Sequence, residues 1–185
     1  MTFLSVRHIR KAKFIDGVSE SDIIELGGGG MINNREASGL RKSPFIELTD
    51  EEIKFLKGEI KAIEADETVF RFNQGRSTGY RDETDIIFVK SNVFPSGESI
   101  HPRDLMSARA VLAHEYYGHR ANRGTPLPRD SWNDEFRASY MAAKNTPSLT
   151  LQDRVYLIMD AIERARNAGV SIRYNSFIRS VLYGY

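Results

Sequence analysis

Residues 114–119 read His-Glu-Tyr-Tyr-Gly-His and bring together the side chains that a metal-activated water site uses. Imidazole nitrogens bind zinc, and a carboxylate beside the ligands can act as general base for a metal-bound water. Zinc peptidases of the H-E-x-x-H type place their two histidines four residues apart, on one face of a helix. Here His114 and His119 are five residues apart. On an ideal helix, which turns about 100° per residue, this spacing would separate them by roughly 140°.

The extra residue predicts a π-helical turn within this motif. One inserted residue returns the two imidazoles to a common face, and π-bulges occur frequently at functional sites. Gly118 favours the distortion, because glycine tolerates an unusual backbone and weakens a regular helix. In this geometry Glu115 leans toward the open side of the metal, which makes it the expected general base.

The composition restricts the ligands of such a site. The chain has no cysteine, so a transition-metal site must be built from histidine and carboxylate. Only four histidines are present, and we expect His8 and His101 to lie at the surface. A catalytic zinc ion takes three protein ligands and keeps one open position. Asp134 and Glu135 begin the next predicted helix, and a helical hairpin would aim one of them at the two imidazoles.

Overall charge and hydropathy exclude several other classes of protein. A formal charge of +1 over 185 residues gives no reason to expect nucleic acid or an acidic membrane as a partner. No apolar run reaches the roughly 20 residues that span a bilayer, and the basic N-terminus lacks the apolar core of a signal peptide. We therefore expect a cytoplasmic protein, or a module delivered as part of a larger secreted protein.

The elements that must position the motif are predicted by periodicity and by capping residues. Residues 1–48 are irregular, and we expect the four-glycine run at residues 27–30 to be a loop rather than a phosphate site. Thr49 and Glu52 form a capping box that starts a helix running to about Asp66. The later predicted elements are two strands, Thr68–Phe72 and Asp85–Lys90, separated by turn-rich residues 73–84, and four helices, Arg103–His119, Trp132–Lys144, about 150–168 and Ser171–Tyr185.

These elements predict a single α+β domain over residues 1–185. Residues 49–102 supply a helix and a small sheet, and residues 103–185 form a mainly helical part that carries the metal site. A donor for the transition-state oxygen is also needed beside the metal. The available donors are Tyr117, Arg137, Tyr140, Tyr156 and Tyr174, of which we take Arg137 and Tyr174 as the expected catalytic residues.

Residues 114–119 resemble the H-E-x-x-G-H motif of the dipeptidyl peptidase III family of zinc peptidases. Residues 134–139, Asp-Glu-Phe-Arg-Ala-Ser, are similar to the second motif of that family, E-E-x-x-A-[ED], with Ser139 in place of the last acid. The resemblance implies that His114, His119 and Glu135 bind Zn²⁺ and that Glu115 is the general base and acid. It also implies that Asp134 orients one of the histidines.

Size and layout are similar to those of the small zincin-like domains found in bacterial polymorphic toxins and phage-associated proteins. This resemblance implies a minimal zincin-like fold, a peptide or protein substrate and, for a toxin, an immunity protein as partner. In zincins an edge strand pairs with the extended substrate, and Asp85–Lys90 or Thr68–Phe72 would be that strand. The alternative is a metal-binding or protein-interaction domain that keeps the fold without catalysis.

Overall fold

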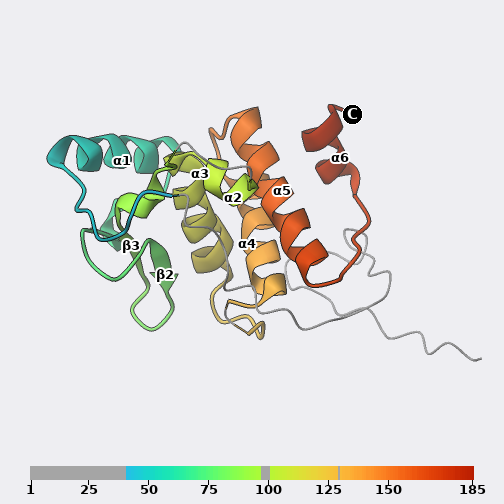
Figure 1. Cartoon of the computed structure of the whole chain (residues 1–185), viewed down its shortest axis with the longest axis horizontal. Coiled ribbons are helices and arrows are strands. Elements are labelled where there is room, and N and C mark those ends of the chain that lie inside the picture. The colour runs from blue at the N-terminus through green and yellow to red at the C-terminus, as the bar shows by residue number, and fades with distance from the viewer. Residues whose placement is uncertain (1–40, 97–100, 129) are drawn as a thin grey trace, which may run out of the picture.

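The structure of the protein, a computed structural model, describes residues 41–96, 101–128 and 130–185 (Figure 1). The expectations for the glycine run at residues 27–30 and for His8 lie outside the described residues. In the described part, helix α1 (Asp50–Ala62) starts at the predicted capping box, in which Thr49 and Glu52 exchange hydrogen bonds.

A three-stranded sheet with the order β1-β3-β2 follows α1. Strand β1 (Phe70–Phe72) pairs in parallel with β3 (Ile86–Val89), and β2 (Gly79–Arg81) pairs antiparallel with β3. The sequence predicted no strand in the turn-rich residues 73–84, but β2 lies there. Its three residues have no alternating pattern, and the strand is defined by its pairing with β3.

The predicted helix Arg103–His119 is divided in the structure. It consists of α2 (Pro102–Leu105), α3 (Ala108–Ala113), the π-helix η3 (His114–His119) and, just beyond, the short 3₁₀-helix η4 (Arg120–Asn122). The helix is interrupted at Ser107, whose hydroxyl group accepts a hydrogen bond from Ala110 N and donates its proton to Asp153 Oδ1. A serine that caps a helix in this way starts a new helix, so the metal motif belongs to α3 and η3.

Three further helices complete the chain: α4 (Trp132–Asn145), α5 (Leu151–Asn167) and α6 (Ser176–Tyr183). The predicted bounds of α4 and α5 agree with the structure to within one or two residues, whereas α6 begins later than expected. Helix α4 packs against both α5 and η3, which places it between the metal motif and the rest of the helical half.

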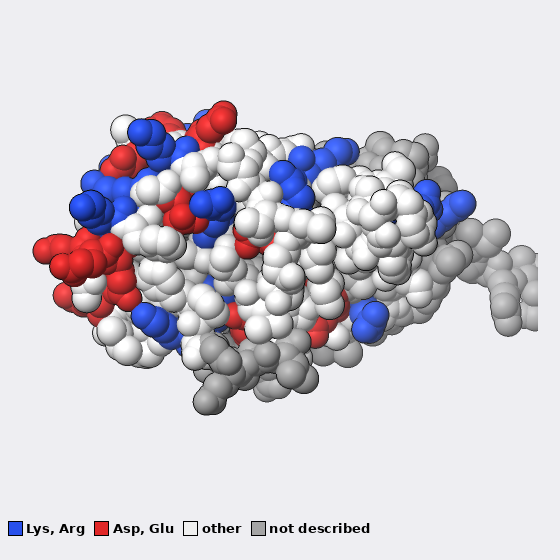
Figure 2. Space-filling model, turned by 90° about the horizontal axis from the view of Figure 1, so that it is seen from above, with Lys and Arg blue, Asp and Glu red and all other residues white. Residues whose placement is uncertain are grey.

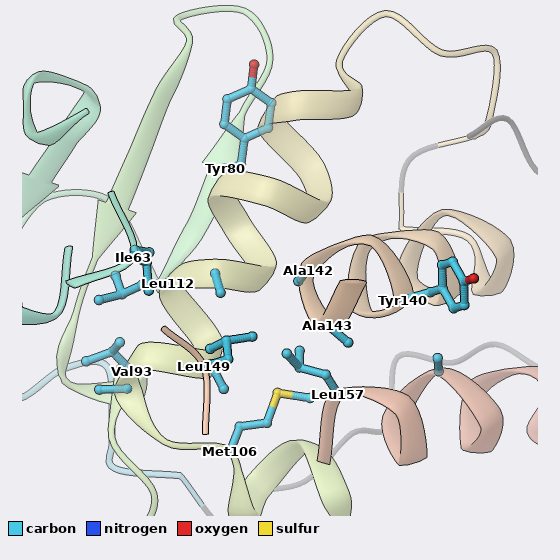
Figure 3. Packing of buried hydrophobic residues seen from close by; sticks show 14 of the residues in the cluster. Ile63, Tyr80, Val93, Met106, Leu112, Tyr140, Ala142, Ala143, Leu149 and Leu157 are labelled. Atoms are coloured by element: carbon cyan, nitrogen blue, oxygen red, sulfur yellow. The ribbon is translucent and has the colours of Figure 1, made fainter. Parts of the chain in front are cut away.

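The hydrophobic core joins the sheet to the helices. Leu112 of α3, Tyr140 of α4 and Leu157 of α5 are fully buried (Figure 3). Ile87 of β3 is fully buried in the same core. Because α3 is anchored in this core, the π-helix that continues it is held in place at its first residue.

The fold class is therefore α+β, as predicted. On the face shown in Figure 2, acidic and basic side chains are interspersed and gather at the end of the molecule where α1 lies. None of the helices in the described ranges has the length and apolar character needed to cross a membrane.

Candidate metal centre

The two histidines of the motif lie on a π-helix, as the spacing predicted. The π-helix covers His114–His119, and the ring centroids of these two residues are 4.8 Å apart. The structure also gives a second reason for Gly118. A Cβ at this position would lie 2.5 Å from the carbonyl oxygen of Ala138, so the missing side chain allows η3 to approach the backbone of α4.

Glu135, near the start of α4, meets both imidazoles. The Nε2 atoms of His114 and His119 are 3.0 Å apart, and each lies 3.5 Å from an oxygen of Glu135. Two donors bound to tetrahedral zinc at about 2.0–2.1 Å are roughly 3.3 Å apart. The three groups therefore have the separations that a tetrahedral metal ion requires.

A buried chain of hydrogen bonds fixes the tautomer of His114. Ser139 donates its hydroxyl proton to Asp160 Oδ2 at 2.6 Å, and the same hydroxyl oxygen lies 3.0 Å from Nδ1 of His114. Because the hydroxyl proton is already used, Nδ1 of His114 must be the donor of the second bond. The lone pair of His114 Nε2 then faces Glu135 and His119.

Asp134 has the corresponding position beside the other histidine. Its Oδ2 lies 3.6 Å from Nδ1 of His119, and its Oδ1 accepts a hydrogen bond from Arg137 at 2.5 Å. A proton on Nδ1 of His119 is favoured by this carboxylate, which leaves Nε2 as the free nitrogen. Asp134 thus lies beside a candidate ligand, and its role in orienting His119 stays a prediction.

Two lone pairs that face each other at 3.0 Å require a cation between them. In the metal-free protein a proton can fill this role. Burial opposes the charged form of His114, but the hydrogen bond with Glu135 and the charges of Glu115 and Glu135 outweigh it and raise the pKa of His114. The raised pKa favours a proton on His114, with which a metal ion at this group would compete.

A buried arginine keeps the third group of the site ionised. Arg164 of α5 lies with Nη1 3.0 Å from Glu135 Oε2 and with Nε 2.8 Å from Asp160 Oδ2. Burial of Glu135 opposes ionisation, but the charge of Arg164 and the hydrogen bond with His114 dominate and lower the pKa of Glu135. The carboxylate is thus available as an anionic ligand at any pH near neutrality.

Glu115 is held by the backbone of strand β2. Its Oε2 accepts a hydrogen bond from Tyr80 N at 2.8 Å. The strand beside the site is therefore β2. The expectation that Asp85–Lys90 is an edge strand was wrong, because β3 is the central strand of the sheet. Strand β1, within Thr68–Phe72, is an edge strand but does not line the cleft.

The site opens into a cleft of about 470 Å³. Its lining includes His114, His119, Glu115 and Glu135, residues 77–82 around β2, and the arginines Arg41, Arg103 and Arg164. Within the described chain the group of potential ligands consists of His114, His119 and Glu135, whose donor atoms all lie within 4.8 Å of one another. His101 is half exposed and pairs with Glu163, away from this group.

The residues expected to stabilise the transition state have other contacts. Arg137 lines the cleft, but its guanidinium is buried against Asp134 and the hydroxyl of Thr125. Tyr174 does not line the cleft, nor do Tyr117, Tyr140 and Tyr156. The hydroxyl of Tyr117 donates to Ile63 O at 2.8 Å. None of these tyrosines is brought to the metal group.

Sequence reasoning missed Asp160 and Arg164. The available signal was a pair of opposite charges four residues apart within the apolar stripe of the predicted helix, beside Leu157 and Ala161. Charges on the buried face of a helix are rare unless they are paired, and such pairs often serve a site.

The comparisons with known proteins identify no relative. The chain matches no protein-family model, no curated protein and no solved structure.

Proposed function

We propose that this protein is a zinc-dependent peptidase in which Glu115 is the general base. The observation that carries the proposal is the convergence of three donor groups, from His114, His119 and Glu135, at separations that suit tetrahedral zinc. Ser139 and Asp134 lie beside the Nδ1 atoms of His114 and His119, which leaves the two Nε2 atoms to face one point. Glu115 lines the same cleft.

The donor set favours catalysis over a purely structural role. Structural zinc sites are closed by four protein ligands, whereas catalytic sites have three and keep one position for water or substrate. The described residues supply three. This count favours the peptidase over a structural metal site, while the alternative of a metal-binding domain without turnover is tested by the substitution of Glu115.

The chemistry then depends on Glu115. A zinc ion bound here would lower the pKa of a water at its open position to about 7. The Oε2 atom of Glu115 is fixed on Tyr80 N, and Oε1 accepts no hydrogen bond from the described residues. Oε1 is thus the atom that would take the proton from this water and pass it to the leaving amine.

The proposed substrate is a peptide or a protein, and the proposed setting is a toxin or effector module of bacterial or phage origin with an immunity protein as partner. The substrate class is supported by the metal group and the adjacent carboxylate in an open cleft. The setting is supported by the similarity in size and layout to small zincin-like toxin domains.

Metal analysis and a base substitution test the proposal. The purified wild-type protein should contain close to one equivalent of zinc, and His119→Ala should contain almost none. Glu115→Gln should retain zinc and lose hydrolysis of fluorescein-labelled casein and mixed quenched peptides by about 10²–10⁴-fold, because the general base is removed. A wild-type protein without zinc, or a fully active Glu115→Gln protein, would contradict the proposal.

A further inference from the structure

The buried side chain of Arg164 is connected to two of the candidate metal ligands. Arg164 is mostly buried, with 11% of its side chain exposed, and projects from α5 into the wall of the cleft. Its Nη1 binds Glu135 directly, at 3.0 Å. Its Nε binds Asp160, which receives the hydroxyl of Ser139 and thereby fixes His114. A single guanidinium is thus connected to two of the three candidate ligands.

The shape of the guanidinium suits this bridging contact. Its nitrogens form a planar, rigid fork, so that two carboxylates on different helices can be held at a fixed distance from each other. Glu135 lies on α4 and Asp160 on α5. Lysine carries the same charge as a single point on a flexible chain and cannot hold both carboxylates with the same geometry.

Charge alone would not account for an arginine at this position. A positive charge next to a metal group repels the metal ion, and this repulsion is strengthened by burial. The benefit must lie in the two carboxylates. Without Arg164, the fully buried Asp160 would keep only Ser139 and the longer contact of 3.5 Å with Arg103. Glu135 would keep only its contacts of 3.5 Å with the two imidazoles.

We propose that Arg164 is a positioning residue of the metal site, which fixes Glu135 directly and His114 through Asp160 and Ser139. The inference rests on the proposed function, because it takes these residues as metal ligands. It adds that the geometry of the site is set from α5, a helix that contributes no ligand itself.

The substitution Arg164→Lys distinguishes the positioning of the two carboxylates from the effect of the positive charge. The charge near the metal is retained, so the repulsion is unchanged, while the bridging geometry is lost. We expect the affinity for Zn²⁺, measured by competition with a chromophoric chelator, to fall by about 10–100-fold, the usual effect of removing a partner that orients a ligand. The visible spectrum of the Co²⁺-loaded protein should change as well, because Glu135 no longer has a fixed orientation.

The matched control is Arg154→Lys. Arg154 lies on the same helix and donates hydrogen bonds to the carbonyl oxygens of Ala143 and Thr146, but it has no contact with the metal group. We expect this variant to bind Zn²⁺ like the wild type and to give the wild-type Co²⁺ spectrum. Thermal unfolding of the two metal-free variants shows whether a loss of affinity at Arg164 merely reflects loss of the fold.

Three outcomes are distinguished. Weaker Zn²⁺ binding and an altered Co²⁺ spectrum in Arg164→Lys alone support the inference. Equal affinities and identical spectra in the wild type and Arg164→Lys overturn it and leave the metal site standing. A wild-type protein that binds neither ion overturns the proposed function together with this inference.

Discussion

The cleft has two walls that hold their functional groups in different ways. The wall formed by η3, α4 and α5 presents the candidate metal ligands as largely buried side chains, each with a polar partner on α4 or α5. The opposite wall is the short strand β2, which holds Glu115 through one backbone N–H. The proposed metal ligands and the proposed base Glu115 are thus held by contacts from different parts of the fold, although Glu115 itself belongs to η3. Substitutions should therefore affect one set of contacts without the other.

The largest effect is expected at Gly118, where the wall formed by η3, α4 and α5 leaves no space for a side chain. In Gly118→Ala the new Cβ would lie 2.5 Å from the backbone of Ala138, so η3 and α4 must separate. We expect the free energy of unfolding to fall by about 1–3 kcal/mol and Zn²⁺ affinity to fall as well. Chemical denaturation and chelator competition measure both.

Gly58→Ala is the control for this substitution. Gly58 lies within α1, and a Cβ there has no atom within 4 Å. Because alanine is the better helix former, this change should stabilise the protein by about 0.5–1 kcal/mol. Equal effects of the two substitutions would show that η3 does not pack closely on α4.

The second effect concerns the hydrogen-bond chain behind His114. Ser139→Ala removes the acceptor of His114 Nδ1 and a partner of Asp160. Zn²⁺ affinity should fall by about tenfold or more, while Ser180→Ala, which removes a hydroxyl on the exposed side of α6, should leave it unchanged. An unaltered affinity in Ser139→Ala would show that the orientation of His114 does not depend on this hydroxyl.

The smallest effect is expected in the wall that carries β2. Asp85 binds Arg120 at 2.9 Å and Arg123 at 2.6 Å, and these contacts connect the sheet to the residues just after η3. The hydrogen bonds from Arg120 and Arg123 lower the pKa of Asp85 to about 2. Asp85→Asn should reduce the melting temperature slightly near neutral pH and leave Zn²⁺ affinity unchanged.

The lowered pKa of Asp85 determines how its contribution to stability depends on pH. The folded-state pKa of Asp85 is below its ordinary value of 3.8, so the ionised group stabilises the folded protein above about pH 4. This contribution is lost as the pH falls toward 2. The difference in melting temperature between the wild type and Asp85→Asn should therefore disappear over that range, and a difference that grows there would contradict the assignment.

The sequence predicted the wall formed by η3, α4 and α5 better than the wall formed by β2. The spacing of His114 and His119 has one simple geometric solution on a helix, and the π-helix is that solution. Helix α4 begins at Trp132, as predicted, and this start brings Glu135 to the imidazoles. These features are local, so a short stretch of sequence contains the information.

The remaining features depend on contacts between distant segments. Strand β2 exists because three residues pair with β3, and Tyr80 N reaches Glu115 across 35 positions of the chain. Arg164 and Asp160 are close in sequence, but their role depends on how α5 lies against α4. Neither the periodicity of apolar residues nor a short motif determines which distant segments come into contact.

Strand β2 also bears on how copies of this protein behave toward one another. The free edge of a sheet can pair with the sheet of a second molecule, and natural proteins avoid this by keeping edge strands short or charged. Here the edge strand has three residues, and the amide of Tyr80 is taken by the carboxylate of Glu115. The residue that we propose as the general base thus also occupies an amide on the β2 edge that could otherwise pair with a second molecule.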